Sequence, residues 1–500
     1  MSPGRGGGLV AGVLPAPLRD PAQRRGLLGW LGVGLAVRLL LMPFSVSADL
    51  LAIYWRSHLI AYDGQLFGSY LVNMGAHYVH AASLRLLAPL LPAPDEVWTD
   101  PWWWADSSAL APQVQRAFSE SPGAYQTLFA LKLPYLAADL AAGLLLLALV
   151  GACRPALVRR AWAFWMLSPI GLYATYVFGR YEALAVVFVV GALWACERER
   201  PWLGALLLGV GITMRGYPLL LVPVFALIVF RRPLRQAAWA AVALAPFAAI
   251  MASNRMLAGT VGELATLRDF HTGTTFFAYT LPVEGDGQVY VFFLFALTVY
   301  GALAGRAWGW WSRPGEISQL WLWLLVFHAG MFALATFSAH YFMWITPFVA
   351  LALARREQWR GVLPLHLLQA GAVLAIADLL GGPGTLLGLF EPLEPDLVAA
   401  APSLREALLG SPGLVVQGLG LLRTGFFAAM LLLVWPAVRE LAVGELRGGD
   451  LRAGLGARDT PVGDVAPRRA AAAGAQAPHA EPERADDQRE PHSRESRLFR

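Results

Sequence analysis

Long, continuous apolar runs fill most of the chain, and short clusters of charged residues separate them. Because a helix needs roughly 20 apolar residues to cross a bilayer, we predict an all-α, polytopic transmembrane helical bundle with about 12 spans. The runs lack the alternation of a membrane β-barrel, so a barrel is excluded. The predicted spans cover approximately residues 26–44, 125–151, 161–178, 181–196, 202–213, 217–230, 237–251, 289–305, 319–336, 341–354, 362–380 and 412–436.

One pair of runs, 202–213 and 217–230, is separated by an Arg-Gly-Tyr-Pro sequence that starts at Arg215. Glycine and proline interrupt a helix, and irregular backbone at membrane depth is tolerated only where it lines a cavity. Two half-helices and a re-entrant hairpin both fit this pattern.

Composition supports the membrane class. The 500 residues are 57% hydrophobic and 15% charged, and the mean hydropathy is +0.51. Soluble domains have roughly 25% charged residues, so a soluble class is excluded. The net charge of +5 does not indicate a nucleic-acid partner, because the basic residues form short clusters between apolar runs.

The arginines concentrate in alternate loops. Cytoplasmic loops of membrane proteins carry an excess of basic residues. We therefore expect a multi-pass protein of the plasma membrane with both termini in the cytoplasm and the active site on the extracytoplasmic face. Five internal loops then hold Arg154, Arg159, Arg160, Arg198, Arg200, Arg231, Arg232, Arg235, Arg306, Arg313, Arg355, Arg356 and Arg360.

Three regions follow from this pattern. Residues 1–25 form a cytoplasmic N-terminal segment, 26–440 form the transmembrane domain, and 441–500 form a cytoplasmic tail. The tail is rich in Ala, Pro, Arg and Glu and cannot bury a core, so we expect it to be disordered.

Two outer segments, 45–124 and 252–288, are long enough to have a role of their own. Within the first, Asn73–Leu91 has apolar residues on one helical face, which predicts an interfacial helix that lies on the membrane. The tryptophans at 102–104 suit the headgroup level of a membrane.

Asp49 lies about five residues beyond the outer end of the first predicted span. A carboxylate held there suits a general base that acts on a hydroxyl arriving from outside. Aspartate is also a good helix N-cap, so capping of the following helix is the alternative role. Arg56, seven residues further on, is a candidate substrate-binding residue.

Arg215 stands where flanking Gly and Pro residues make the backbone irregular. A guanidinium there can hold two phosphate oxygens at once. The alternative is an arginine that reaches to the membrane surface along its aliphatic stem.

Further candidates lie near the predicted outer ends of spans. Arg180 and Glu182 form either a binding turn or an interfacial charge pair. His340 and Tyr341 can bind a phosphate or a sugar hydroxyl, or can anchor the span at the membrane surface.

Lys132 can meet a phosphate. It can also pair with Asp139, which is seven residues away and near the same helical face.

Several motifs are absent from the sequence. It has no Walker A motif, no Cys/His cluster, no Gly-x-Ser-x-Gly elbow and, in the first outer loop, no Asp-x-Asp pair. The pattern therefore indicates no ATP motor and no metal site.

Taken in order, these motifs resemble those of the GT-C superfamily of integral-membrane glycosyltransferases, most of all its bacterial mannosyltransferase-type branch. Arg180 and Glu182 stand where the family has glutamine and aspartate. The matching positions are Asp49, Lys132 to Asp139, Ser168-Pro169 with the turn Gly179 to Glu182, Arg215 with Pro218 to Pro223, and His340-Tyr341.

The resemblance implies an inverting transfer of mannose or a similar hexose or pentose from a polyprenyl-phosphate donor. The acceptor would be a hydroxyl on a glycan, a glycolipid or a protein. Asp49 would be the base, and Arg215, Lys132, Arg180 or His340 would neutralise the leaving phosphate. The donor is a substrate, so no cofactor is expected.

A transporter or flippase of lipid-linked sugars is the alternative function. It would share the spans, the buried arginines and a groove for the lipid. The long outer segment 45–124 and the absence of an internal repeat favour the enzyme.

The arginine pattern predicts which parts of the chain face outward. Single cysteines introduced near Ala93 and near Ala473 should react with a membrane-impermeant thiol reagent from opposite sides of intact cells. Labelling of both from outside would contradict the predicted topology and, with it, the position of the active site.

Overall fold

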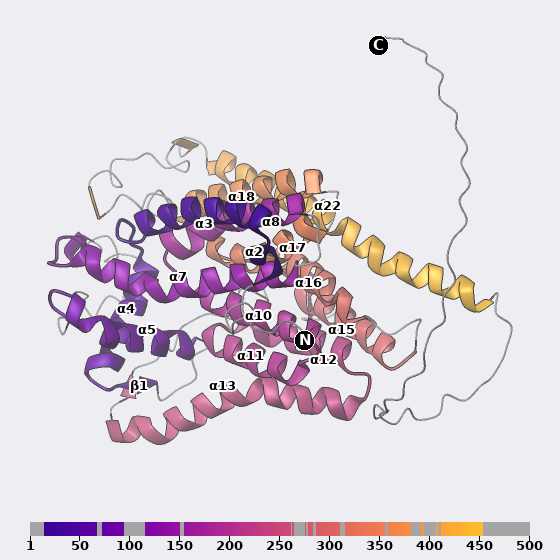
Figure 1. Ribbon diagram of the computed structural model, residues 1–500, viewed down its shortest axis with the longest axis horizontal. Coiled ribbons are helices and arrows are strands. Elements are labelled where there is room, and N and C mark those ends of the chain that lie inside the picture. Colours follow the sequence, from indigo (N-terminus) through magenta and orange to yellow (C-terminus); the bar gives the residue numbers. More distant parts are fainter. Residues whose placement is uncertain are drawn as a thin grey trace, which may run out of the picture. The chain divides into compact units, whose positions relative to one another are not determined.

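The computed structural model describes residues 15–67, 73–94, 116–150, 155–261, 263–264, 276, 279–283, 287–310, 316–355, 359–381, 392–394, 407–408 and 412–453. The tryptophans at 102–104, nearly half of the second outer segment and most of the predicted tail lie outside these residues. Contacts divide the chain into one unit, Met1–Leu451, and a second, Arg452–Arg500. Apart from the last two residues of α22 (Pro412–Ala453), the helices described here belong to the first unit (Figure 1).

Five helices in the described part of the chain are long and apolar enough to cross a membrane. The structure fits the predicted all-helical membrane class, but the predicted count of about 12 spans is not supported. The five are α7 (Ala124–Leu149), α13 (Pro233–Val261), α16 (Leu320–Leu334) with the preceding 3₁₀ turn η5 (Ile317–Gln319), α18 (Trp359–Gly381) and α22 (Pro412–Ala453).

Apart from α3 (Pro21–Leu41), which has 21 residues, the other predicted spans fold as shorter or interrupted helices. With 16 and 14 residues, α10 (Glu182–Glu197) and α11 (Pro201–Met214) are too short to cross the hydrocarbon core upright. At 1.5 Å per residue they extend about 24 and 21 Å, against a core of about 30 Å. Continuous apolar sequence therefore overstated the number of complete crossings.

The remaining helices complete the bundle. Several of them end where a proline follows, because proline cannot continue a preceding helix. These elements are α2 (Ala16–Arg19), α3 (Pro21–Leu41), α8 (Pro155–Leu167), α9 (Pro169–Leu172), the π-helical turn η3 (Tyr173–Val177), the 3₁₀ helix η4 (Tyr217–Leu221), α12 (Val222–Val229), α15 (Val291–Ala307), the 3₁₀ helix η6 (Ala339–Ile345) and α17 (Thr346–Arg355).

The first outer segment folds into α4 (Ala48–Tyr62), α5 (Met74–Leu87) and the short η1 (Ala88–Leu90). The helix predicted at 73–91 is thus present, and it packs on α4, α7 and α11. Strand β1 (Leu66–Phe67) pairs in parallel with β2 (Glu263–Leu264), which joins the two outer segments.

A second small sheet lies before α15. It is an antiparallel pair of β3 (Thr280–Pro282) and β4 (Gln288–Tyr290).

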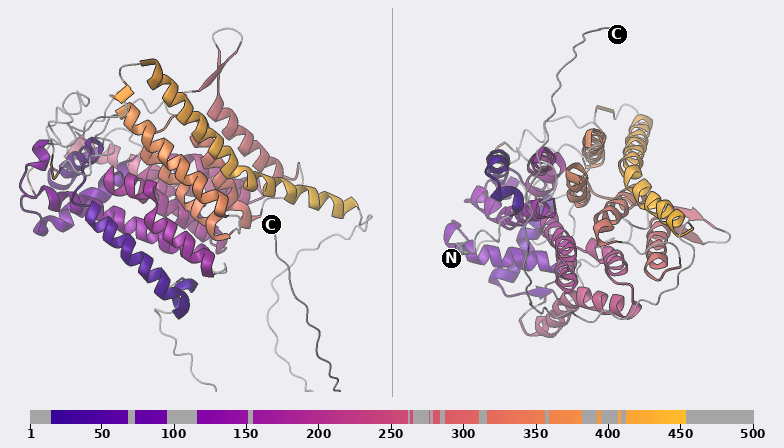
Figure 2. Two further views of the ribbon diagram at one scale, coloured as in Figure 1. Left: turned by 90° about the horizontal axis from the view of Figure 1, so that it is seen from above. Right: turned by 45° about the vertical axis from the view of Figure 1, so that its right-hand side comes forward.

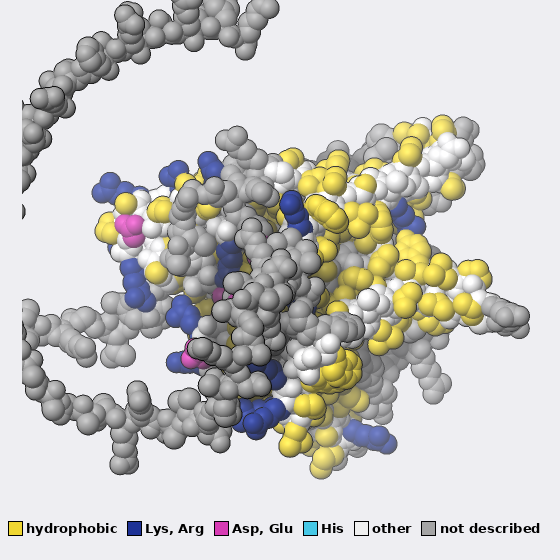
Figure 3. All heavy atoms as spheres, turned by 90° about the vertical axis from the view of Figure 1, so that its right-hand side faces the viewer, with side chains coloured by type: hydrophobic (Ala, Val, Ile, Leu, Met, Phe, Trp, Pro, Cys, Tyr) yellow, Lys and Arg dark blue, Asp and Glu magenta, His cyan; other side chains and the backbone are white. Residues whose placement is uncertain are grey.

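Helix α10 lies at the centre of the bundle. It packs between α7 and α11, α11 packs on α13, and α8 packs on α3 and α17 (Figures 1 and 2). Much of α13 and α22 is exposed, with apolar side chains such as Leu234, Met256, Leu421 and Trp435 on the surface. Figure 3 shows apolar side chains over much of one described face. These exposed faces suit contact with lipid.

The interrupted pair of runs around Arg215 forms a helical hairpin. The rings of Trp202, near the start of α11, and Phe230, after the end of α12, lie 5.5 Å apart. The two arms therefore return to the same end, and Arg215 lies at the tip. Its extended backbone (φ −156°, ψ 147°) ends α11. The arms are thus two short helices that form a hairpin, and re-entry of this hairpin into a membrane stays a prediction.

Loops assigned to the cytoplasm by the arginine pattern gather at one end of the bundle. Arg355 Nη2 lies 2.9 Å from Glu197 Oε2 and donates a hydrogen bond to Leu149 O. Trp308 Nε1 donates to Gln236 Oε1 at 3.2 Å. The alternation of the loops across a membrane, and the side that this end faces, stay predictions.

A buried ion pair joins the first helix to the bundle. Arg38 Nε on α3 lies 2.7 Å from Asp139 Oδ2 on α7. The Arg38 guanidinium also donates to the carbonyls of Trp165 and Met166, which the break before Pro169 leaves without a helical partner. Asp139 therefore pairs with Arg38, and the pair with Lys132 considered from the sequence does not form.

Candidate functional site

Six of the predicted site residues meet where four elements converge: the start of α4, the turn before α10, the tip of the α11–α12 hairpin, and η6. We call this group the charged cluster. It contains two carboxylates and two arginines, and an aromatic group surrounds them. Its members are Asp49, Arg180, Glu182, Arg215, His340 and Tyr341.

Asp49 lies in the first turn of α4, and its side chain is 40% exposed. The capping role considered for it belongs to Ser47 instead, whose hydroxyl accepts a hydrogen bond from Leu50 N at 3.1 Å. The Asp49 carboxylate is therefore not used as a cap. Its Oδ2 atom lies 3.3 Å from Arg180 Nε.

The turn that carries Arg180 depends on a glycine. Gly179 has φ +72°, a conformation that favours glycine. A Cβ atom there would also lie 3.0 Å from Leu50 Cδ2 and 3.3 Å from Lys132 Cε. Ser47 Oγ donates to Phe178 O at 2.6 Å. The turn is thus held against the start of α4, which brings Arg180 beside Asp49.

Glu182 is fully buried and contacts three residues from two other elements. Its Oε1 atom lies 3.5 Å from Arg215 Nε and 3.8 Å from His340 Nε2. Trp344 Nε1 donates a hydrogen bond to the other carboxylate oxygen. A buried carboxylate is tolerated only when it is paired, so Glu182 fixes the hairpin tip and η6 against the start of α10.

Arg215 is held on several sides but keeps donors free. Its Nη1 atom donates to Tyr181 Oη at 2.5 Å, and its guanidinium lies 4.5 Å from the ring centre of Tyr341. Among the described residues, no hydrogen-bond partner is found for its Nη2 group. A guanidinium presented in this way can still bind an oxyanion.

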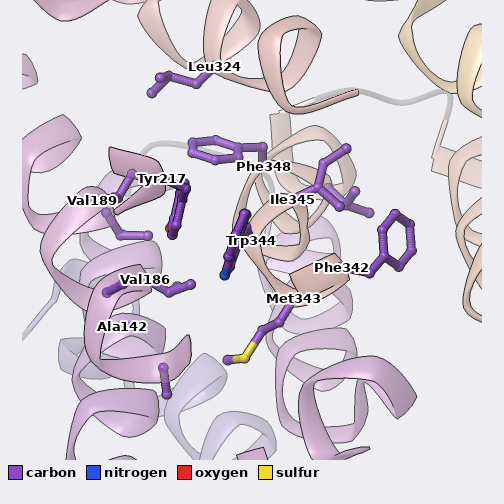
Figure 4. Close-up of a cluster of buried hydrophobic side chains, with 14 of the residues drawn as sticks. Ala142, Val186, Val189, Tyr217, Leu324, Phe342, Met343, Trp344, Ile345 and Phe348 are labelled. Atoms are coloured by element: carbon purple, nitrogen blue, oxygen red, sulfur yellow. The ribbon is translucent and has the colours of Figure 1, made fainter. Parts of the chain in front are cut away.

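Stacked aromatic rings underlie the cluster. The rings of Tyr217 and Trp344 are stacked 3.9 Å apart, and Trp344 is also stacked on Tyr341 at 4.7 Å. Figure 4 shows Tyr217 and Trp344 facing each other within the buried core. The low-dielectric surroundings strengthen the charge interactions of the cluster.

Arg56 lies beside the cluster on α4, where its charge interacts with Asp49 and Arg180. Burial lowers the pKa of Arg56 to about 10, so its guanidinium stays protonated at neutral pH. It therefore contributes positive charge behind the Asp49–Arg180 pair.

Lys132 lies outside the charged cluster and is already coordinated. Its ammonium group donates to Met42 O at 2.9 Å and to Ser45 O and Ser45 Oγ, both at 2.6 Å. An ammonium group has three donors, so these bonds account for all of them. In this structure Lys132 anchors the segment between α3 and α4 to α7.

An apolar cavity of about 690 Å³ adjoins the charged cluster. Tyr173, Phe178 and His340 line the end beside the cluster, and the ring of His340 is stacked on that of Phe178 at 4.6 Å. The rest of the wall comes from α16, the segment 335–339 that follows it, α18, α22, Tyr279 and Val291. The cavity therefore meets the charged cluster at His340 and extends from there toward helices that can span a membrane.

Tyr181, Trp344 and Asn73 hold the charged residues, although the sequence analysis assigned them no role. Tyr181 and Trp344 lie within the same sequence motifs as predicted site residues, so their proximity in sequence to those residues could have indicated their role. Asn73 donates a hydrogen bond to Tyr181 Oη across 108 positions of sequence. No periodicity or motif indicated this contact.

No protein-family model matches this chain, and neither a curated protein nor a solved structure is detectably similar to it. The site is therefore interpreted from its own geometry.

The coordination of Lys132 predicts a structural role. Replacing Lys132 by Met should lower the thermal unfolding midpoint of the detergent-purified protein, because the carbonyls of Met42 and Ser45 lose their donor, at about 1–3 kcal/mol for each buried group left unpaired. Any affinity for the polyprenyl phosphate expected from the sequence should change less than about twofold, because Lys132 does not reach the charged cluster. An unchanged midpoint with a clearly weakened phosphate affinity would instead indicate direct contact with the ligand.

Proposed function

We propose that this protein is a membrane glycosyltransferase that transfers mannose or a similar sugar from a polyprenyl phosphate to an acceptor hydroxyl, with inversion. The observation that carries the proposal is the convergence of an accessible carboxylate, two buried arginines and an apolar cavity in one site. The carboxylate would act as the base, the arginines would bind the anionic leaving group, and the cavity would hold the lipid tail. The resemblance in motif order supports the same assignment.

Asp49 is the proposed general base. The acceptor oxygen attacks the anomeric carbon while the bond between that carbon and the phosphate oxygen breaks. The proton of the acceptor hydroxyl passes to Asp49, whose exposed side chain an incoming hydroxyl can reach. The sugar is thereby joined to the acceptor, and polyprenyl phosphate leaves with its additional negative charge.

Arg180 can interact with both the proposed base and the leaving phosphate. It is paired with Asp49 before the reaction, at 3.3 Å. When Asp49 accepts the proton it loses its charge, and in the same step the phosphate gains one. Arg180 can then stabilise the leaving phosphate without leaving a buried charge unpaired.

Arg215 is the proposed second phosphate ligand. Glu182, Tyr181 and Tyr341 fix its guanidinium, while its Nη2 donors remain available. Donors that are already oriented are worth more to a developing charge than donors that must reorganise. The fixed geometry therefore favours a phosphate over a hydroxyl ligand at this position.

The apolar cavity is the proposed site for the first part of the polyprenyl chain. Its volume of about 690 Å³ lies within the usual range for ligand pockets, roughly 300–1,000 Å³. Because α18 and α22 form one wall, the rest of the chain can continue into lipid. One lipid phosphate molecule would then place its phosphate group at the charged cluster and its tail in the cavity.

A flippase of lipid-linked sugars would need the same lipid groove but no base. Turnover of a panel of radiolabelled polyprenyl-phosphate sugars by the purified protein in detergent distinguishes the two, because only an enzyme releases polyprenyl phosphate. Transport across vesicles without any release would favour the flippase.

Asp49→Asn tests the proposed base. It keeps the size of the side chain and removes its basicity, so turnover should fall by about 10²–10⁴-fold. Donor affinity should be nearly unchanged. The measurement is specific activity of the purified, folded variant. The matched control is Asp63→Asn, at the opposite end of α4, which should keep normal turnover. Near-normal activity of Asp49→Asn would remove Asp49 from the mechanism.

Arg215→Lys and Arg215→Ala test the proposed phosphate ligand. Lysine keeps the charge but lacks the planar fork, so it should weaken donor binding and turnover less than alanine does. Donor KM and kcat of both variants should be compared with those of Arg255→Ala, which removes an exposed arginine on α13. If neither substitution at Arg215 changes donor binding or turnover, Arg215 has only a structural role.

A further inference from the structure

Asn73 occupies the N-cap position of α5 but does not cap the helix. Asparagine is among the best capping residues, because its side-chain oxygen can accept a bond from the free N–H groups of the first turn. Here its amide nitrogen donates instead to the phenol oxygen of Tyr181. The side chain is buried and directed away from its own helix, which indicates a role outside α5.

The phenol oxygen of Tyr181 also accepts a hydrogen bond from Arg215 Nη1, at 2.5 Å. Tyr181 itself lies between Arg180 and Glu182 in the turn before α10. The Asn73 amide, the Tyr181 phenol and the Arg215 guanidinium thus form a continuous chain of hydrogen bonds. The chain runs from the first outer segment to the tip of the α11–α12 hairpin.

This chain controls the rotation of the Arg215 guanidinium. The rings of Tyr181 and Tyr341 lie 5.1 and 4.5 Å from it and attract its charge. Such ring contacts depend only weakly on how the guanidinium is turned in its own plane. The contact with Glu182, at 3.5 Å, is longer than a strong charge-assisted bond. The bond to Tyr181 is therefore the directional contact that aims the remaining donors.

We propose that Asn73 is a positioning residue: through Tyr181 it orients the Arg215 guanidinium for the phosphate group of a polyprenyl phosphate. The inference rests on the proposed function, because it takes the ligand of Arg215 to be that phosphate. It gives α5 a part in the site, since Asn73 is the N-cap residue of that helix. The contact also ties α5 to the turn that places Arg180 beside Asp49.

The test measures binding of decaprenyl phosphate and of decaprenol, which lacks the phosphate, to the purified full-length protein in detergent. Asn73→Ala and Tyr181→Phe should each weaken affinity for decaprenyl phosphate by about five- to tenfold, as expected for one directional hydrogen bond. Affinity for decaprenol should not change. The matched control is Tyr217→Phe. It removes another buried phenol oxygen near the hairpin tip, one for which no hydrogen-bond partner is found among the described residues, and it should bind both lipids normally.

Two further comparisons identify Arg215 as the group through which Asn73 acts. In an Arg215→Lys background, Asn73→Ala should cause little additional loss of phosphate affinity, because the oriented fork is already absent. Thermal unfolding of every variant provides the measure of folding. If Asn73→Ala folds poorly, Tyr181→Phe provides the same test, because it keeps the ring and its packing.

Three results would overturn the inference: normal decaprenyl-phosphate affinity in both variants, equal loss for decaprenol, or an undiminished effect of Asn73→Ala in the Arg215→Lys background. Failure of the proposed function would be recognised separately. A wild-type protein that binds decaprenyl phosphate but transfers no sugar would refute the transferase and leave the positioning role intact. A wild-type protein that does not bind decaprenyl phosphate would refute both.

Discussion

The fully buried carboxylate of Glu182 is the interaction on which the arrangement of the site depends. An unpaired charge at this depth would be strongly destabilising, so the fold must supply partners from other elements. It does so with Arg215 from the hairpin tip and with His340 and Trp344 from η6. The same requirement brings Arg215 under Tyr181 and places the stacked aromatic rings beneath the cluster.

Short and interrupted helices make this convergence possible. A helix that crossed the whole bilayer would carry its ends to the membrane surface, whereas α10 and α11 are about 24 and 21 Å long. Their ends therefore deliver Glu182 and Arg215 into the interior of the bundle, where the Asp49–Arg180 pair and the apolar cavity adjoin them. Interrupted helices are thus the means by which this fold holds charges away from water, which is what transfer of a lipid-bound phosphate would require.

The sequence alone was sufficient for the class of protein and for most candidate positions. Continuous apolar runs predicted a helical membrane protein, and Gly and Pro around Arg215 predicted an interrupted helix there. These features follow from local chemistry, because apolar length and proline act on the segment that contains them. Polar residues beside apolar runs need partners. On this ground the sequence identifies Asp49, Arg180, Glu182, Arg215, His340 and Tyr341 as candidates.

Only the tertiary structure decided which of those charges meet. Lys132 and Asp139 are near neighbours on α7, yet Lys132 binds the segment at Met42 and Ser45 while Asp139 binds Arg38, 101 positions earlier. Ser47 rather than Asp49 caps α4, and Asn73 leaves its own helix uncapped to reach Tyr181. The sequence shows which groups need partners. Which partner each group finds depends on its burial and on distances between segments that are far apart in the chain. These quantities are defined only in the folded bundle.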